Sequence, residues 1–496
     1  MSFAFKTVDA RLRTIRPMNT RTSSQCPFHA GTAAPAPALH PPGVWPPGPR
    51  AGLTGWPLLR AMSRDLLGTL AGWQRAHGDT VHLRMWPEHV VAVTDPALVR
   101  ELLVTHHDAF VRWERGIRVF SQVHGHSVLV AEGDAWRDKR HALQPNFMPK
   151  PVQAFVPAIA ATAGHALAQW PAHDAHWPVE SALTSLAMDV IMRTMFSNVI
   201  GEDARVAEAA VRTVSAVSNA EFYQPVSAPD WMPWKRGKVR ALAVLNRLID
   251  RQLHVRLDQP ERNWPDDLLS RLLRLHRADA RAWPLQAVHD ECMTAFLAGH
   301  ETAAATLTWW AWSMAVNPAV QAAARDEVVR VLDGRAPTAD TRPALCYLTQ
   351  TLEETMRLYP AAPILISRRA SRPVVLGAWQ FPARTLFMLP LQLMHLDERW
   401  FPEPHAFRPE RFADDAPPLP RGAYMPFGTG PRVCLGQHLA MTEMTVVAAM
   451  ILQRYVLAVP PGTTPPRPVL NVTLRPAQAL HLAIAPAGLT ADAVSS

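Results

Sequence analysis

The segment FGTGPRVCLG at residues 427–436 constrains the fold more than any other part of the chain. Its glycines allow positive φ angles and a close approach of the backbone to another group. They are Gly428, Gly430 and Gly436. Cys434 stands where a helical pattern begins, and the free N–H groups and positive dipole end of a helix favour a thiolate. A lone cysteine is more often a small buried side chain, but the flanking phenylalanine, glycines and arginine favour a functional sulfur.

Helical periodicity dominates the chain from about residue 45 onward, because apolar residues recur three or four positions apart. The clearest helical segments are 66–78, 96–107 and 179–196. Residues 79–96 are rich in β-formers and predict a hairpin, and 373–391 predicts a second strand region. We therefore predict a mainly α fold with small β-sheets (α+β).

Two further segments frame the predicted domain. Residues 1–44 are rich in proline and alanine and are expected to be disordered or extended, so that 45–496 forms a single large domain. Residues 222–238 interrupt two helices with proline and tryptophan and predict a mobile cover. A long apolar helix is expected over 283–316, and another follows Cys434.

Composition excludes several classes of protein. The net charge of +8 is scattered, and only five of the 50 basic residues are lysine, so no nucleic-acid-binding arm is indicated. The four cysteines form no CxxC pair, which argues against a disulfide framework or a zinc ribbon. No uninterrupted apolar stretch of about 18 residues indicates a transmembrane anchor. The N-terminus lacks a secretory signal, although its arginines leave a transit peptide open, so we expect a cytoplasmic protein.

Charged and polar residues at helical spacing mark three more segments. Glu354 and Arg357 in EETMRLYP lie on one helix face, where such a pair is usually a weak surface ion pair. AGHETA at 298–303 places an acid beside an alcohol inside the long apolar helix, which costs free energy unless partners or water satisfy them. A polar stripe facing another helix is the simpler interpretation. In GDAWRDKRHALQPNF, Trp136 and Arg140 are one helical turn apart.

FGTGPRVCLG resembles the haem-binding loop of the cytochrome P-450 family at every fixed position of that pattern. The resemblance implies the family's fold, with haem b between the long central helix and the Cys-loop helix. It implies that Cys434 is the axial ligand of the haem iron, that Phe427 packs beside the haem and that Arg432 meets a propionate. Gly428 and Gly436 are the loop glycines that bind the cofactor.

The other motifs follow the family's order, and the resemblance extends from about residue 45 to the C-terminus. It implies that Glu354 and Arg357 are buried and pair with Arg411 of PERF, and this third partner offsets the free-energy cost of burying the charges. It implies that Thr302 hydrogen-bonds O2 and that Glu301 relays protons through water.

Further residues are assigned by the same resemblance. Trp136, Arg140 and Arg368 are expected to meet the propionates, with Arg368 preferred to Arg369 on its offset alone. The substrate pocket is expected to include Ala298 and Ile364.

The implied activity is that of a haem-thiolate monooxygenase of soluble, bacterial type. It would insert one oxygen atom from O2 into a lipophilic substrate by hydroxylation or epoxidation, the substrate being fatty-acyl, terpenoid, steroid or polyketide. Electrons would come from NAD(P)H through a ferredoxin or flavodoxin and its reductase, and Arg137 and Lys139 are candidate docking residues. A monomer is expected.

Two other functions fit the same motifs less well. A peroxygenase or isomerase of the same fold would use peroxide without external electrons, but such members commonly lack the acid–threonine pair that Glu301 and Thr302 form here. A haem-based sensor would need an output module, and the sequence indicates neither a helix-turn-helix nor a signalling domain.

Overall fold

The computed structural model describes residues 39–198, 204–222 and 232–488, and one compact unit begins at Leu39. The helices are α1 (Trp56–Arg64), α2 (Leu66–His77), α3 (Pro96–Arg100), α4 (Glu114–His124), α5 (Gly133–Leu143), α6 (Pro149–Gln153), α7 (Val156–Ala168), α8 (Val179–Phe196), α9 (Ala204–Phe222), α10 (Arg236–Leu257), α11 (Leu268–Ala278), α12 (Leu285–Val316), α13 (Pro318–Leu332), α14 (Cys346–Leu358), α15 (Leu391–His395) and α16 (Gln437–Arg454). The predicted mainly helical fold is confirmed.

Within residues 39–198, 204–222 and 232–488 the strands form four separate sheets. They are β1 (Thr80–Met85), β2 (Glu88–Val93), β3 (Phe110–Arg112), β4 (Asp174–Trp177), β5 (Leu365–Ala370), β6 (Val374–Leu376), β7 (Trp379–Phe381), β8 (Leu386–Leu389), β9 (Tyr455–Ala458), β10 (Pro468–Asn471), β11 (Thr473–Pro476) and β12 (Leu482–Pro486). The largest sheet has the order β1-β2-β8-β5-β3, and within it β2 and β8 run parallel, with Val91 opposite Phe387. The smaller sheets are β4-β12-β9, β10-β11 and β6-β7.

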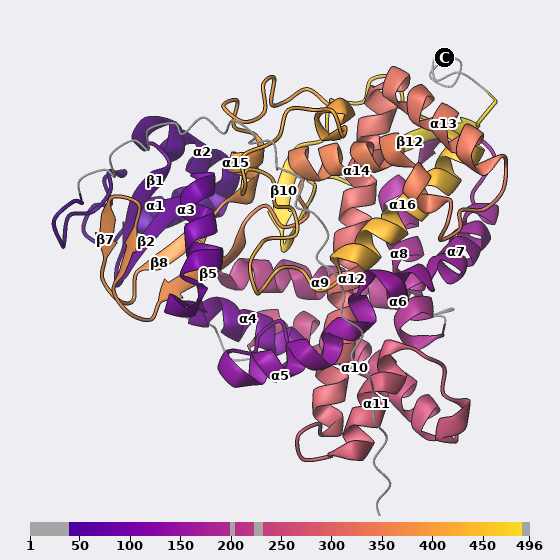
Figure 1. The fold of residues 1–496 in the computed structure, drawn as a ribbon, viewed down its shortest axis with the longest axis horizontal. Coiled ribbons are helices and arrows are strands. Elements are labelled where there is room, and N and C mark those ends of the chain that lie inside the picture. The colour runs from indigo at the N-terminus through magenta and orange to yellow at the C-terminus, as the bar shows by residue number, and fades with distance from the viewer. Residues whose placement is uncertain (1–38, 199–203, 223–231, 489–496) are drawn as a thin grey trace, which may run out of the picture. The chain divides into compact units, whose positions relative to one another are not determined.

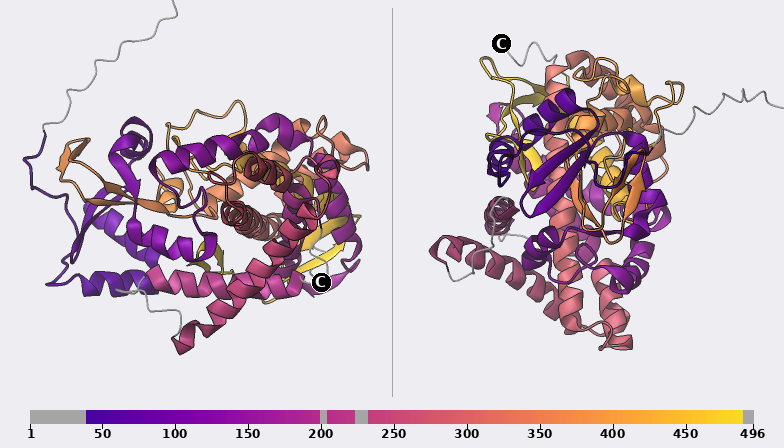
Figure 2. Two further views of the ribbon diagram at one scale, coloured as in Figure 1. Left: turned by 90° about the horizontal axis from the view of Figure 1, so that it is seen from below. Right: turned by 90° about the vertical axis from the view of Figure 1, so that its left-hand side faces the viewer.

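Most of the helices lie apart from the large sheet, although α1, α2 and α3 lie beside it. Figure 1 shows β1, β2, β5 and β8 on the left and most helices on the right, and the left-hand view of Figure 2 repeats this separation. The long helix α12 passes through the helical side, where α8, α14 and α16 pack against it. Its tryptophans Trp309 and Trp310 are fully buried in the largest apolar core.

Local sequence explains where several helices start. Asp65, Asp95 and Asp267 each cap a helix, accepting hydrogen bonds from the N–H groups of Gly68, Leu98 and Ser270 at 2.8–3.0 Å. The end of α12 coincides with Asn317-Pro318, because a proline cannot continue a helical ladder. None of the described helices has the length and hydropathy that crossing a membrane requires.

Several predicted elements are confirmed and one is wrong. Helix α8 covers 179–196, and 79–96 contains the β1–β2 hairpin. The single helix expected over 96–107 is interrupted, because α3 ends at Arg100 and a π-helical turn follows over Glu101–Thr105. Of the predicted cover over 222–238, residues 223–231 lie outside the described residues, as do residues 1–38 of the predicted N-terminal segment.

Candidate active site around Cys434

The Cys434 loop is held in shape by its own backbone and by two left-handed glycines. The N–H of Cys434 donates to the carbonyl oxygen of Phe427 at 2.9 Å. Gly428 and Gly430 have φ angles of 72° and 76°. A Cβ atom on Gly430 would lie 2.2 Å from the carbonyl oxygen of Leu103, so only glycine fits there.

The third loop glycine does not use the positive φ that glycine permits. Gly436 has a φ of −88° and is the residue before α16. Its N–H group forms a hydrogen bond that lowers the pKa of Cys434. Gly436 therefore serves the site through its backbone N–H group at the helix start, where such groups are free to bind an anion.

The sulfur of Cys434 lies among protein atoms and yet faces open space. The residue is exposed, although desolvation by the surrounding protein raises the pKa of its thiol. The Gly436 N–H group and the charge of Arg140 oppose this shift, but desolvation is the largest influence. A stable thiolate here therefore needs a further cation at the sulfur, which a haem iron would supply.

The middle of α12 is mostly buried but presents one accessible face. Between Glu291 and Ala315 the residues that are not buried are Ala295, Ala298, Gly299 and Thr302. Their spacing of three and four places them on one side of the helix. The Thr302 hydroxyl donates to the carbonyl oxygen of Ala298 at 2.8 Å. Ile364, just before β5, is half-buried.

Glu301 points away from the accessible face. Its carboxylate accepts hydrogen bonds from Ser215 of α9 and Thr473 of β11 at 3.4 Å, and Arg475 Nε lies 3.8 Å away. Burial raises the pKa of this carboxyl above its ordinary value, and the charge of Arg475 opposes the shift only in part. Glu301 is therefore a weakly compensated acid beside Thr302, and its place in a proton relay stays a prediction.

Three of the residues predicted to meet the propionates line one cavity of about 420 Å³, namely Trp136, Arg368 and Arg432. The guanidinium of Arg432 lies 4.2 Å from the centre of the Trp136 ring. It also pairs with Glu132 at 2.5 Å, and that carboxylate accepts a further bond from Arg112 at 2.9 Å. Arg140 is held nearby, donating to the carbonyl oxygen of Val433 at 2.8 Å.

Arg368 and Arg369 have different partners. Arg369 is buried and forms ion pairs with Glu88 at 2.8 Å and Glu114 at 2.7 Å. Among the described residues Arg368 pairs with no carboxylate, and burial, followed by the charge of Arg112, lowers its pKa to about 10. A cation in this position gains from an anionic partner, so the residues present fit a haem propionate at Arg368.

Glu354 and Arg357 form a fully buried ion pair on α14. Arg357 Nε and Nη2 donate to the two carboxylate oxygens at 2.7 and 2.8 Å. Arg411 Nε lies 3.3 Å from Glu354, and the backbone N–H of Arg408 donates to the same oxygen at 2.9 Å. Every charge in this cluster therefore has several partners, which is the condition for burying it.

Two residues that sequence reasoning missed connect these parts. His395 accepts the N–H of Met425 through Nε2 at 3.1 Å, and its carbonyl oxygen accepts Arg357 Nη1 at 2.8 Å, so it joins the buried ion pair to the chain just before the Cys434 loop. Glu132 bridges Arg112 and Arg432. The sequence signal for His395 was a histidine at the end of the apolar run LPLQLMH. No sequence signal pointed to Glu132.

The expectation that Arg137 and Lys139 together form a docking face is wrong for Lys139. Its ammonium pairs with the buried carboxylate of Glu291 at 2.8 Å and lies 5.2 Å from the centre of the Trp283 ring. The lysine is thus bound to the long helix and its neighbour. Arg137 is exposed and pairs only with Asp134 among the described residues.

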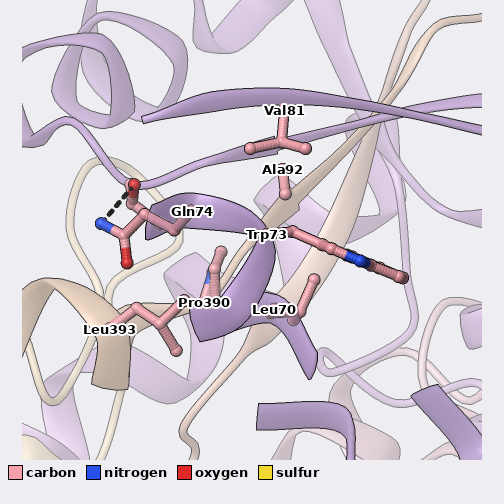
Figure 3. A pocket seen from close by; sticks show the side chains of 8 residues that line it. Leu70, Trp73, Gln74, Val81, Ala92, Pro390 and Leu393 are labelled. Carbon is pink, nitrogen blue, oxygen red and sulfur yellow. Dashed lines mark hydrogen bonds between the residues drawn. The ribbon is translucent and has the colours of Figure 1, made fainter. Parts of the chain in front are cut away.

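A second cavity is too small to hold a substrate. It measures about 10 Å³ and lies between α2, the β1–β2 hairpin and the start of α15. Figure 3 shows Leu70, Trp73, Val81 and Leu393 around it. A volume of this size holds at most one water molecule, so the cavity is part of the packing and not a site.

Comparisons with known proteins agree on one family. A family model described as Cytochrome P450 matches residues 46–483. The cyclooctat-9-en-7-ol 5-monooxygenase of Streptomyces melanosporofaciens is 32% identical over 424 residues, covering 81% of this chain and 90% of that protein. The cyclooctatin synthase of the same organism is 32% identical over 86% of this chain and 92% of its own length. Cytochrome P450 734A4 of Oryza sativa subsp. japonica is 30% identical over 78% of each chain.

Proposed function

The chain belongs to the cytochrome P450 family and is a monooxygenase that uses haem and O2, and we propose that it hydroxylates a terpenoid. The observation that carries the substrate class is the 32% identity, over most of the chain, to two enzymes named for cyclooctatin chemistry. The accessible face of α12 supports it, since Ala298, Gly299 and the apolar Ile364 near the site offer little to a charged substrate.

The residues around Cys434 would hold the haem. Cys434 would be its axial ligand, with Phe427, Gly428 and Gly436 shaping the loop beneath it. Arg432, Trp136, Arg140 and Arg368 would bind the propionates. When bound, a thiolate-ligated haem supplies the O2 activation that inserts one oxygen atom into a C–H bond.

Thr302 and Glu301 would manage protons on the distal side. The Thr302 hydroxyl lies on the accessible face and can turn from the Ala298 carbonyl oxygen toward that face. Glu301, the preceding residue, lies on the buried side, and its raised pKa favours a bound proton nearer neutral pH. This division lets an acid reload the hydroxyl while remaining shielded from solvent.

Electrons would come from NAD(P)H through a ferredoxin or flavodoxin and its reductase. Exposed Arg137, next to the cavity lined by Trp136 and Arg432, would contribute to docking an acidic carrier. Replacing Arg137 by Glu should slow the first electron transfer at low salt and have little effect at high salt. An unchanged rate at low salt would remove Arg137 from the docking face. A cytoplasmic monomer stays a prediction.

The first test is a carbon monoxide difference spectrum of the reduced protein. A strongly red-shifted Soret band that Cys434→Ser abolishes is the expected result. Terpenoids are then incubated with the protein, NADPH and a ferredoxin with its reductase, and in parallel with hydrogen peroxide alone. Product that depends on the carrier supports the proposal. Product from peroxide alone would support the peroxygenase alternative, and oxidation of fatty acids in preference to terpenoids would contradict the substrate class.

A further inference from the structure

A buried polar chain links α4 to the long helix α12. His124 Nδ1 lies 3.2 Å from the Thr294 hydroxyl oxygen, and the Thr294 hydroxyl donates to Ser127 Oγ at 2.7 Å. All three residues are buried, with Ser127 fully so. Hydroxyl and imidazole groups are costly to bury, and this chain satisfies each hydroxyl with a partner.

The three hydrogen-bonded side chains lie at one end of the accessible face of α12. Thr294, Ala298 and Thr302 are four residues apart in turn, so they follow one line along the helix. Two helical turns separate Thr294 from Thr302, a rise of about 12 Å. A substrate of terpenoid size lying along this face would therefore reach from the Thr302 hydroxyl to the His124 side chain.

The hydrogen-bond directions leave the histidine with one unused acceptor. Thr294 gives its only proton to Ser127, so its oxygen must accept from His124, which places the imidazole proton on Nδ1. Burial lowers the pKa of His124 to about 4, so the ring is neutral at pH 7 and Nε2 carries a lone pair. No described residue forms a hydrogen bond with Nε2, so its lone pair has no donor among the protein groups described.

The loop that follows His124 is fixed, so this acceptor is preorganised. Asp290 accepts the N–H of His126 at 2.7 Å, and Glu291 accepts the N–H of Val128 at 3.0 Å. A Cβ atom on Gly125 would lie 2.1 Å from the Asp290 carboxyl carbon, so loop and helix are in close contact. The centre of the Phe120 ring lies 6.0 Å from the centre of the His124 ring.

We propose that His124 Nε2 accepts a hydrogen bond from a hydroxyl group of the substrate, so that the preferred substrate is a terpenoid alcohol and not a hydrocarbon, ether or ketone. The inference rests on the proposed function and narrows it. It also places the enzyme after a reaction that introduces a hydroxyl group into the terpenoid skeleton.

The test compares probe molecules with the same carbon skeleton, of which only the alcohol has a hydroxyl group that can donate a hydrogen bond. Cedrol, cedryl methyl ether and cedrane form one set, and menthol, menthyl methyl ether and p-menthane form another. Their dissociation constants for the haem-loaded protein are measured by calorimetry and by the change in the Soret spectrum. Each alcohol should bind roughly 3- to 10-fold more tightly than its ether, the range of one net hydrogen bond.

Variants then show whether His124 causes the preference for alcohols. His124→Leu should abolish the alcohol preference and leave ether affinity within about 2-fold, whereas His124→Gln, whose amide oxygen can accept, should keep part of it. Ser127→Ala frees the Thr294 proton to bind Nδ1, which moves the imidazole proton to Nε2 and should shift the preference toward ethers and ketones. His481→Leu, which removes an exposed imidazole in the loop before β12, is the matched control.

The outcomes separate the two proposals. Terpenoids that bind with no alcohol preference, or with a preference that survives in His124→Leu, would overturn the role of His124 while leaving the terpenoid proposal intact. If no terpenoid of either set binds, both proposals fail. Melting curves and the carbon monoxide spectrum show that each variant is folded and loaded.

Discussion

Two buried glutamates, Glu354 on α14 and Glu301 on α12, have opposite electrostatic surroundings. Glu354 receives two bonds from Arg357 at 2.7 and 2.8 Å and one from the backbone of Arg408 at 2.9 Å. Glu301 has only contacts of 3.4 to 3.8 Å, and burial raises its pKa. Short hydrogen bonds from several donors compensate the buried charge of Glu354, whereas Glu301 has none of this length.

The difference separates a structural charge from a group that can exchange protons. A carboxylate held by several donors is fixed in place, because each of those donors would be left without an acceptor if it moved or were removed. A buried carboxyl with long contacts gains little from ionisation and can take up and release a proton at modest cost. The same helical core thus holds one acid that several donors fix in place and one whose surroundings suit proton exchange.

Removing one partner of the compensated pair should have the largest effect. Arg357→Met leaves the Glu354 charge buried and should lower the free energy of unfolding by about 3–5 kcal/mol. Urea denaturation of the wild type and of the variant measures this difference. The double variant Glu354→Gln with Arg357→Met should recover part of the loss. A loss below about 1 kcal/mol for the single variant would show that the pair is not needed.

Removing the weakly compensated acid should affect catalysis more than stability. Glu301→Gln keeps the size and polarity of the side chain but not its proton, and general acid catalysis contributes roughly 100-fold or more. Product formation should fall by about 10- to 100-fold while NADPH consumption continues. Steady-state rates of both reactions, with Ser215→Ala as a control that keeps the acid, measure the effect. Unchanged product formation would exclude Glu301 from the relay.

The pH dependence of stability should report the unusual surroundings of Glu301. The folded-state pKa of Glu301 is raised above its ordinary value of 4.5, so its contribution to stability is fully present below pH 4.5 and is lost as the pH rises through the folded pKa. Glu301→Gln removes this titration and should therefore become more stable relative to the wild type as the pH rises. Unfolding free energies between pH 4 and pH 8 test the trend, and a difference that is constant with pH would contradict it.

The smallest effect is expected from an ion pair on the protein surface. Asp134 and Arg137 are spaced three residues apart on α5 and are both exposed. Exposed pairs contribute about 0–1 kcal/mol, so Asp134→Asn should change the free energy of unfolding by less than about 0.5 kcal/mol. Denaturation at low and high salt is the measurement. A change in the free energy of unfolding as large as that of Arg357→Met would show that the contribution of an ion pair does not depend on its burial.

The sequence predicted what depends on local pattern. Periodicity predicted both ends of α8 and most of α12, and the hairpin followed from alternating β-formers around Pro87. The π-helical turn at Glu101–Thr105 was not predictable, because its helical spacing resembles that of α-helix. It lies against the Cys434 loop, where the Leu103 carbonyl oxygen approaches Gly430.

Pairings between distant residues could not be predicted. Lys139 faces Glu291, and His395 meets Met425, only because the chain folds back on itself. Charge type and spacing along one helix say nothing about a partner more than a hundred residues away. The direction of the Glu301 side chain is a similar case, since its contacts with Ser215 and Thr473 depend on how α9 and β11 approach α12.

The order of strands in the large sheet has a consequence for biosynthesis. The hairpin β1–β2 is made early, but the parallel neighbour of β2 is β8, whose Leu386 pairs with Val90. The ribosome must therefore add nearly 300 residues, which takes roughly 15–60 s at typical rates of synthesis, before β2 can complete its ladder. During that interval the apolar edge from Val90 to Val93 is open to pairing with other nascent chains. We expect yield in a heterologous host to depend on chaperones and on slow translation at low temperature.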